Sequence, residues 1–335
     1  MKVLMFSSDP ENPRLKRYAE VLDKLEIIDL SRKRGRILRF WKGYFEAKNL
    51  LTQEKFDLIT AQEVEHSFLA WRLSKKFGTP WQMQIHTDIF SPYFARELFL
   101  NKMRVLLAKF LIPRAGCVRV VSERIKRSIG RDAVVLPIFS ETKDGGGENM
   151  KQKYPGYDFY ILMVGRLARE KNIGLALAAM REVIKEFNGL LVIIGDGPER
   201  QNLEKEVLDG LEANVRFEGA GWGKDLTGYY QSADCLLLSS NYEGYGLVTI
   251  EAIQNGLPVI MSDVGVAGEI IKNDENGIIV PVGDAVKFTE AILRLQNDKE
   301  LRSRLIEGTR KTKLPYASFE EYRDKLVNSW KTCRR

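Results

Sequence analysis

The feature that most constrains this chain is a regular alternation of short apolar runs with helical patterns along its whole length. Such runs, apolar throughout and separated by helices, predict parallel sheets that are covered on both faces. An example of the helical pattern is "LALAAMREVIKEF" (175–187), which is apolar at i, i+3 and i+4 spacing. The predicted strands are 2–6, 26–30, 56–61, 81–86, 117–122 and 133–138, then 159–164, 190–195, 215–218, 234–239, 258–262 and 277–281.

This pattern predicts two doubly wound, Rossmann-like α/β domains that face each other across a cleft, and 335 residues suffice for two separate cores. Residues 1–140 would form the N-terminal domain and residues 159–312 the C-terminal domain. The polar, glycine-rich segment 141–158 would link them. Residues 313–335 include a final helical pattern that we expect to return toward the N-terminal domain. Ligands of this architecture bind at the carboxyl ends of strands, where we therefore look for site residues.

Composition indicates a globular protein, because hydrophobic residues make up 44% and charged residues 29% of the chain. The longest apolar runs have the length of strands, too short to span a membrane, and the opening "MKVLMFSS" is too short for a signal peptide. Cys117, Cys235 and Cys333 are odd in number and have no paired spacing, so we expect all three to be reduced. These features predict a cytoplasmic protein.

The net charge of +7 is unevenly distributed. Residues 1–150 contain 27 Lys and Arg against 18 Asp and Glu, a balance of +9, whereas residues 151–335 contain 25 against 27, a balance of −2. A basic surplus confined to one half predicts a polyanionic partner, either nucleic acid or an anionic membrane surface.

The stretch "NYEGYGLVTIEA" has a carboxylate on each side of a Gly-x-Gly turn, where a strand is expected to give way to a helix. The helix is predicted to begin near Leu247, and its first amides carry partial positive charge that suits phosphate oxygens. Glu251 lies one turn further along the same face, where it can accept hydrogen bonds from ribose hydroxyls. Glu243 precedes the turn and would stand on the other side of the phosphates.

Two cations follow the strand 159–164 in "GRLAREKNIG". Arg166 and Lys171 lie on this strand-to-helix loop and suit a diphosphate, since each can bind a different phosphate oxygen. The glycines of "GDGPER" (195–200) would let the backbone approach a flat ligand, or would merely form a tight turn. The segment 215–226 is a further candidate, for reading the edge of a base.

These motifs resemble those of the retaining GT-B glycosyltransferases of family 4. "EGYGLVTIEA" is similar to the Glu-x7-Glu signature of that family and "VGRLAREKN" to its diphosphate loop, and the match extends from 159 to about 295. The resemblance implies that Arg166 and Lys171 bind the donor diphosphate. It also implies that Glu251 holds the ribose and Glu243 the transferred hexose. The other implied donor-binding residues are those of the turn and helix start, Gly244, Tyr245, Gly246, Leu247 and Val248.

His86 ends the predicted strand 81–86, which would place it at the edge of the cleft, whereas His66 falls in a helical pattern and is taken as structural. In the resembling family, a histidine at a matching position contacts the donor sugar, so His86 joins Glu243, Arg166 and Lys171 as a candidate catalytic residue. The chain departs from the family in "SSDPENPR", which lacks a glycine pair, and in "SDVGVAGEII", which lacks a glycine doublet before Glu269. Both departures concern acceptor recognition more than donor binding.

The run "SRKRGRILRFWKGYFEAKNL" (31–50) projects as a helix with an aromatic face beside clustered cations, which is typical of a helix at an anionic membrane surface. A second stretch, 95–114, repeats the theme with Arg96, Lys102, Arg104 and Lys109. The alternative is that both are core-packing helices with solvated basic faces. The predicted membrane-contact residues are Arg32, Lys33, Arg34, Arg36, Ile37, Arg39, Trp41 and Lys42.

The sequence thus predicts a retaining hexosyltransferase that works without a cofactor and, because no Asp-x-Asp occurs, without a metal. Its donor would be GDP-mannose, favoured on family prevalence, or a UDP-hexose. Its acceptor would be lipid-linked or a glycan, at the inner face of the cell membrane, with no nucleic-acid partner. Two alternatives are a nucleotide-sugar epimerase or hydrolase of the same fold and a non-catalytic nucleic-acid binder. A dinucleotide dehydrogenase is disfavoured, since no Gly-x-Gly-x-x-Gly follows the first strand.

Overall fold

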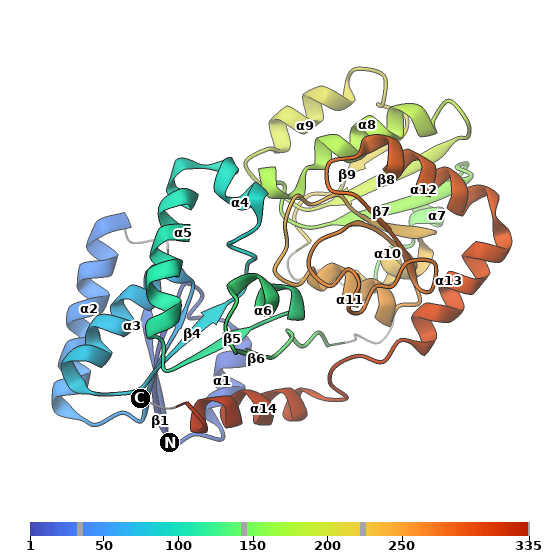
Figure 1. The fold of residues 1–335 in the computed structure, drawn as a ribbon. Helices are drawn as coiled ribbons and strands as arrows, with labels where there is room; N and C mark the ends of the chain where they lie inside the picture. Colours follow the sequence, from blue (N-terminus) through green and yellow to red (C-terminus); the bar gives the residue numbers. More distant parts are fainter. Residues whose placement is uncertain (32–35, 142–145, 222–225, 334–335) are drawn as a thin grey trace. The chain divides into compact units, whose positions relative to one another are not determined.

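The computed structural model divides the chain into two compact units. The first unit comprises Met1–Phe139 and Tyr316–Arg335, and the second comprises Ser140–Pro315. Each unit contains a six-stranded, entirely parallel sheet with helices around it, as the sequence predicts (Figure 1). All twelve expected strands are present. The structure describes residues 1–31, 36–141, 146–221 and 226–333, with the side chains of residues 36 and 37 excepted.

The sheet of the first unit has the strand order β2-β1-β3-β4-β5-β6. Its last strand is shorter than expected, because Pro137 has no N–H with which to continue the ladder. The chain leaves β1 toward β2 and then crosses back to β3, so the strand order reverses between β1 and β3. The strands are β1 (Lys2–Ser7), β2 (Lys24–Asp29), β3 (Leu58–Gln62), β4 (Trp81–Ile85), β5 (Cys117–Val120) and β6 (Val134–Val135).

The final helix of the chain, α14 (Phe319–Lys331), is part of the first unit and packs near α1. Trp330 is fully buried, lies edge-on to the ring of Tyr18 at 6.2 Å, and donates a hydrogen bond from Nε1 to Gln82 Oε1 at 3.0 Å. The core of this unit is therefore completed by the far end of the chain. Its other helices are α1 (Pro13–Ala19), α2 (Arg36–Gln53), α3 (Val64–Phe77), α4 (Pro92–Glu97), α5 (Phe99–Leu111), η2 (Ile112–Arg114) and α6 (Glu123–Ile129).

The expectation that all three cysteines are reduced is wrong for two of them. Cys117, at the start of β5, forms a disulfide with Cys333, just after α14, and their Cα atoms lie 5.3 Å apart. The two residues are 216 positions apart in sequence and become neighbours only because α14 returns to the first sheet. Cys235 is free and buried, and burial raises the pKa of its thiol well above the usual value.

The sheet of the second unit has the order β12-β11-β10-β7-β8-β9, which reverses between β7 and β10. Its strands are β7 (Phe159–Val164), β8 (Gly189–Ile194), β9 (Val215–Phe217), β10 (Cys235–Leu238), β11 (Val259–Ser262) and β12 (Gly277–Val280). Its helices are α7 (Met150–Lys153), η3 (Arg169–Lys171), α8 (Ile173–Val183), α9 (Arg200–Val207), α10 (Thr227–Ser232), α11 (Leu247–Gln254), α12 (Ala285–Asn297) and α13 (Lys299–Lys311).

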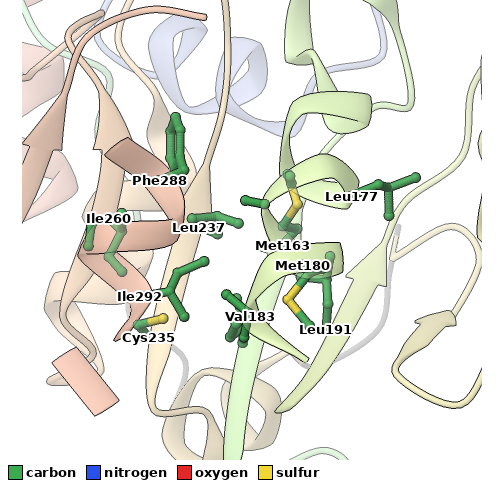
Figure 2. Packing of buried hydrophobic residues seen from close by; sticks show 14 of the residues in the cluster. Met163, Leu177, Met180, Val183, Leu191, Cys235, Leu237, Ile260, Phe288 and Ile292 are labelled. Carbon is green, nitrogen blue, oxygen red and sulfur yellow. The ribbon is translucent and has the colours of Figure 1, made fainter. Parts of the chain in front are cut away.

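A single apolar cluster forms the core on one face of this second sheet, where α8 and α12 pack together. Figure 2 shows Met180 and Val183 of α8 opposite Ile292 and Phe288 of α12, with Leu237 of β10 between them. All five side chains are 0 or 1% exposed. Full burial of one such side chain stabilises the fold by about 1.5–3 kcal/mol, so this cluster fixes the strands that carry the loops described below.

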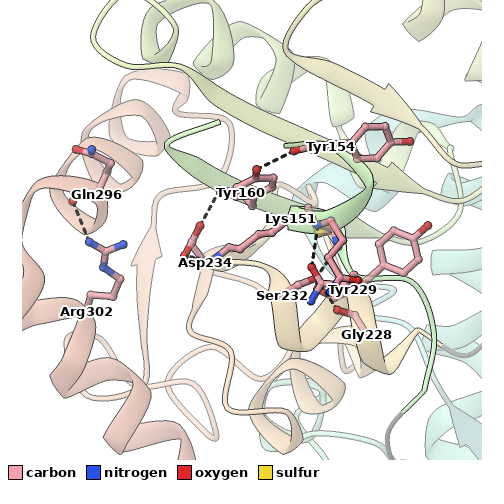
Figure 3. Close-up of polar contacts among 12 residues, drawn as sticks. Lys151, Tyr154, Tyr160, Gly228, Tyr229, Ser232, Asp234, Gln296 and Arg302 are labelled. Atoms are coloured by element: carbon pink, nitrogen blue, oxygen red, sulfur yellow. Dashed lines mark hydrogen bonds and ion pairs between the residues drawn. The ribbon is translucent and has the colours of Figure 1, made fainter. Parts of the chain in front are cut away.

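The predicted linker 141–158 is in part a folded element of the second unit. It contains α7, whose first amide, that of Met150, donates to Ser232 Oγ at 2.8 Å (Figure 3). Lys151 pairs with Asp234 at 3.1 Å, and Asp234 also accepts a hydrogen bond from the Tyr160 amide at 2.8 Å. The local signal for this helix is its cap residue Asn149, whose Oδ1 accepts from the Gln152 amide at 3.1 Å, and the other groups that anchor it lie some 80 residues later in the chain.

Candidate functional site

The candidate site lies where the strand order of the second sheet reverses. From β7 the chain proceeds to β8 and β9 on one side, and it returns to β10 on the other side of β7. The loops that leave β7 and β10 therefore diverge at the carboxyl ends of two neighbouring parallel strands, which is the usual ligand position in this architecture. Arg166 and Lys171 lie on the first loop and Glu243 lies on the second.

Hydrogen bonds hold these two loops together. Ser239 Oγ donates to the carbonyl oxygens of Lys171 and Asn172 at 2.9 and 3.0 Å, and the Asn241 amide donates to the Glu170 carbonyl at 2.8 Å. Asn172 adopts φ 46° and ψ 48°, a left-handed conformation that Asn tolerates better than most residues, and its Nδ2 donates to Asn241 Oδ1 at 3.0 Å. The sequence analysis missed Ser239, Asn172 and Asn241, although they fix the position of Lys171.

Two predicted site residues form an ion pair across the loops. Lys171 Nζ lies 2.5 Å from Glu243 Oε1, and Ser240 Oγ donates to the same oxygen at 2.8 Å. Both charged side chains are largely shielded from solvent. Arg166, at the end of β7, is exposed. The structure therefore brings Lys171 and Glu243 into contact and leaves the guanidinium of Arg166 accessible on the same loop.

The helix α11 begins at Leu247, where the sequence predicts it, and its cap residue Gly246 has φ 84°. Within the part of the chain that the structure describes, no side chain caps this end, and the Thr249 amide donates to the Gly246 carbonyl at 2.9 Å. Gly265 brings a neighbouring loop against the turn: a Cβ there would lie 2.6 Å from the Tyr245 carbonyl. Tyr245 itself is buried, and Leu247 and Val248 are partly exposed. The turn thus offers backbone donors more than side chains.

Glu251, in the second turn of α11, accepts a hydrogen bond from the hydroxyl of Tyr230 at 2.6 Å. Tyr230 is buried in α10, and burial, followed by the charge of Glu251, raises the pKa of its hydroxyl well above the usual value. The phenol is therefore a permanent donor that fixes one oxygen of the carboxylate. Sequence analysis missed Tyr230, since it stands 21 positions before Glu251 on another helix.

The glycines of 195–200 accommodate the protein's own backbone. A Cβ at Gly195 would lie 1.8 Å from the Gly165 carbonyl oxygen, and one at Gly197 would lie 2.3 Å from the Leu167 carbonyl oxygen. The Leu167 amide also donates to the Asp196 carbonyl at 3.0 Å. The loop after β7 therefore explains why glycine is required at these positions, and the approach of a flat ligand to this segment stays a prediction. The segment 215–226, the candidate for reading the edge of a base, lies partly outside the described residues.

His86 belongs to the first unit and follows β4 directly. Burial, and to a lesser extent the nearby charge of Arg119, lowers the pKa of His86 to about 3. Its Nε2 has no hydrogen-bond partner within the described part of the chain. His86 is therefore a neutral imidazole at physiological pH, able to contact a ligand but not to supply a positive charge. His66 is buried in α3, as expected of a structural residue.

The predicted membrane-contact residues fall on α2 and on the segment before it. Arg32, Lys33 and Arg34 lie outside the described residues, as do the side chains of Arg36 and Ile37. Trp41 is 61% exposed and stacks on exposed Phe45 at 6.2 Å, Lys42 is exposed, and Arg39 is partly buried. The buried side of the helix is formed by Gly43, Ala47 and Leu51. The core-packing alternative is therefore wrong for Trp41 and Phe45, whereas Phe40 is partly buried and its ring lies 5.9 Å from that of buried His66.

Within the described ranges, the structure contains no helix with both the length and the apolar character required to cross a bilayer.

Two family models match the chain, one in each unit. Residues 148–312 match the model for glycosyl transferases group 1, and residues 3–136 match the glycosyl transferase 4-like domain. Many relatives match in sequence, among them two glycosyltransferases. An uncharacterised glycosyltransferase of Methanocaldococcus jannaschii is 34% identical over 172 residues, which are 51% of this chain and only 44% of that protein. The UDP-Gal:alpha-D-GlcNAc-diphosphoundecaprenol alpha-1,3-galactosyltransferase of Escherichia coli is 25% identical over 87% of this chain and 81% of its own length.

Solved structures show the same fold over the whole chain. Sucrose-phosphate synthase from Thermosynechococcus elongatus superposes with a TM-score of 0.79 at 21% identity, over 99% of this chain and 98% of its own. Anabaena HepE in complex with UDP and glucose superposes with a TM-score of 0.73 at 18% identity, over 99% and 100%. The chain therefore belongs to the group 1, 4-like glycosyl transferases and has their GT-B fold of two Rossmann-like domains.

Proposed function

We propose that this protein is a retaining glycosyltransferase that moves a hexose from a nucleotide diphosphate sugar to a lipid-linked or glycan acceptor at a membrane surface. The observation that carries the proposal is the Lys171–Glu243 pair at the reversal point of the second sheet, beside the open amino end of α11. The relatives support this class of reaction, since one carries a UDP-galactosyltransferase name and another structure contains UDP and glucose.

In the proposed mechanism, Arg166, Lys171 and the first amides of α11 stabilise the charge that develops on the departing diphosphate. An ammonium group has three N–H donors, so Lys171 can keep Glu243 while it binds a phosphate oxygen. Glu243 would then hold a hydroxyl of the hexose, and Glu251 would hold the ribose. The acceptor hydroxyl would attack on the same face of the sugar that the diphosphate leaves, and a phosphate oxygen would accept its proton.

We propose a hexose donor and keep two candidates for it. Mannose carried by GDP is favoured by its prevalence in the family. A UDP-hexose is favoured by the names of the relatives, so it is tested alongside GDP-mannose. We further propose that the transfer needs no metal, which is checked by measuring activity in the presence of EDTA, and that the product keeps the anomeric configuration of the donor, which is read from its NMR spectrum.

Thermal stabilisation by nucleotides tests the donor site. UDP, GDP, ADP and their sugar conjugates are added to the purified protein, and the nucleotide that binds raises the melting temperature by mass action. Arg166→Ala should reduce this shift. Arg169→Ala is the matched control, because Arg169 is also an exposed arginine on the same loop and pairs only loosely with Glu199 at 3.4 Å. Absence of a shift with every nucleotide at millimolar concentration would overturn the donor site.

The membrane part of the proposal rests on the first unit. The basic run 32–42 would contact an anionic leaflet, and a lipid-linked acceptor would be reached there, at the inner face of the cell membrane. Exposed Trp41 beside Lys42 supports this, since an aromatic ring next to a cation suits the boundary between headgroups and acyl chains. Quenching of tryptophan fluorescence by brominated lipid in anionic vesicles tests it, because Trp41→Phe should remove most of the quenching.

A further inference from the structure

The solvent side of α5 is apolar, the reverse of an ordinary surface helix. Phe99 is 75% and Leu106 is 60% exposed, and Met103 and Phe110 are exposed between and after them. These four residues are spaced i, i+4, i+7 and i+11, so they form one stripe along the helix. The opposite side contacts the protein and includes a polar residue, Asn101, whose Nδ2 donates to the Phe94 carbonyl at 2.9 Å. A stripe of this size outside the core marks an interaction surface.

The apolar surface continues onto the neighbouring helices. Helix α3 contacts both α2 and α5, and the three helices lie side by side in the first unit (Figure 1). Trp71 of α3 is edge-on to Phe110 of α5 at 5.1 Å and also contacts exposed Phe68 at 5.7 Å. We call the solvent side of these three helices the docking face. Its exposed large apolar residues are Leu38, Trp41, Phe45, Phe68, Phe99, Leu100, Met103, Leu106 and Phe110.

The exposed charges on the same three helices are almost all positive. Helix α5 contains no acidic residue, and the carboxylate of Glu65 on α3 is paired with Arg104 at 2.5 Å. Among the described residues of α2, α3 and α5, the only exposed acidic residue is Glu46. The exposed basic residues are Lys42, Arg72, Lys75, Lys76, Lys102 and Lys109.

We propose that the docking face binds an anionic lipid bilayer, with α5 as the helix that inserts its apolar stripe among the headgroups. The exposed apolar side chains suit the boundary with the acyl chains, and the lysines beside them suit the anionic headgroups. A second copy of the chain fits less well. In a two-fold contact the same surface faces itself, so Lys102 and Lys109 would face the basic residues of the other copy.

This inference rests on the membrane contact in the proposed function and deepens it, since it assigns insertion to α5 and not to the basic run 32–42. It involves no residue of the donor site. Binding of vesicles and binding of nucleotide are therefore separate measurements, and the failure of one leaves the other intact.

Flotation with lipid vesicles tests the apolar stripe. The purified protein should bind vesicles that contain phosphatidylglycerol, and Met103→Glu and Leu106→Glu should each lower the partition coefficient about tenfold. Both side chains are exposed, so neither change should disturb the fold. Val286→Glu is the matched control: Val286 is 65% exposed on α12 of the second unit, and its replacement should leave binding unchanged. Equal losses in all three variants would overturn the proposal.

The charged part of the surface is tested separately. Lys102→Glu together with Lys109→Glu should weaken binding to phosphatidylglycerol vesicles about tenfold or more, whereas Lys205→Glu, at an exposed position of α9, should not. Binding should also fall as salt is raised. Equally tight binding to pure phosphatidylcholine vesicles would overturn the assignment to an anionic surface.

The size of the protein in solution separates the bilayer from a second copy. If wild type is a dimer by light scattering, Leu106→Glu is a monomer, and neither binds vesicles, the docking face is an interface between copies and the proposal is wrong. A wild type that is monomeric without lipid and floats with anionic vesicles supports it. The nucleotide-induced rise in melting temperature should persist in Leu106→Glu, which shows that the variant is folded.

Discussion

The two units are built on the same plan, a six-stranded parallel sheet with helices around it, but they treat the outer sides of their helices differently. Of the fifteen exposed large hydrophobic residues in the described part of the chain, thirteen lie in the first unit and only Leu208 and Val286 in the second. Helices α8 and α12 turn their apolar sides to the core, whereas α5 is apolar toward solvent. The same fold therefore gives the second unit few exposed apolar side chains and the first unit an apolar outer surface, on which we propose that a partner binds.

The units differ as well where their strand order reverses. In the second unit, Lys171 and Glu243 form an ion pair there. In the first unit, the corresponding contact joins a neutral hydroxyl and a carboxylate: Ser8 Oγ, in the loop after β1, donates to Glu63 Oε1, in the loop after β3, at 3.2 Å. Donor chemistry with two phosphates is therefore expected in the second unit only, and the following predictions test that division.

The largest effect should come from Glu243→Ala. The substitution removes the group proposed to hold the hexose and leaves Lys171 without its carboxylate, so kcat for transfer should fall by about 10²–10³. Glu182→Ala, which removes an exposed carboxylate of α8, is the control and should keep full activity. Vesicle binding should be the same in both variants. Wild-type kcat in Glu243→Ala would remove Glu243 from the site.

Reduction of the disulfide should destabilise the first unit and spare the second. Loss of the Cys117–Cys333 bond should lower the unfolding free energy of the first unit by about 2–4 kcal/mol, because the reduced unfolded chain is less constrained. Thermal unfolding of wild type is compared with and without dithiothreitol. The double variant Cys117→Ser, Cys333→Ser is the control, since dithiothreitol should not change its melting. Nucleotide binding by the second unit should survive reduction, and its loss would mean that the units are not separate in stability.

A smaller effect is expected on nucleotide binding when Glu251 or its hydrogen-bond donor Tyr230 is changed. Glu251→Ala should weaken nucleotide binding about 10- to 150-fold, because a charged hydrogen-bond acceptor for the ribose contributes about 1.5–3 kcal/mol. Tyr230→Phe removes only the phenol that orients Glu251, so it should weaken binding less and leave kcat at saturating donor unchanged. Titration calorimetry with the nucleotide identified by thermal shift gives both affinities. A larger loss in Tyr230→Phe than in Glu251→Ala would contradict this order.

The last effect concerns acid and builds up gradually with falling pH. Both histidines lie in the first unit, and burial lowers the pKa of each. The pKa of His86 is about 6.5 in the unfolded chain and about 3 in the folded unit. Between these two pH values the unfolded state binds more protons than the folded state. The stability of the first unit should therefore fall as the pH falls through this window, by at most about 1.4 kcal/mol per pH unit for one group. His86→Gln should flatten the slope, and an unchanged slope would show that His86 does not titrate in this way.

How far the sequence predicts the molecule depends on the range of the interactions. The strands and the start of α11 follow from local patterns, apolar runs and a glycine before a helix, and they were predicted. The sequence placed Lys171 and Glu243 after two strands, but their ion pair was not predicted, because it depends on β7 and β10 being neighbours in the sheet. The loop bonds of Ser239 and the phenol of Tyr230 were not predicted, since a serine or a tyrosine in sequence does not reveal its partner.

The outer surface of the first unit was predicted only in part. The basic residues of 95–114 were recognised, but which side of that helix faces the sheet is decided by tertiary packing. Asn101, Ala108 and Leu111 occupy the buried side, and the apolar stripe of Phe99, Met103, Leu106 and Phe110 faces outward. A hydrophobic pattern alone is the same for a stripe that faces the core and for one that faces solvent. The disulfide was missed for a related reason, since its cysteines meet only in the folded unit.

The position of α14 has a consequence for biosynthesis. On the ribosome, the first unit is begun before the second but lacks Trp330 and Tyr322, which are central to its core, until all of Ser140–Pro315 has been made. The second unit is continuous in sequence and can fold as soon as it leaves the exit tunnel. We therefore expect the second unit to complete its core before the first. Until α14 is made, the apolar core of the first unit lacks two of its largest side chains.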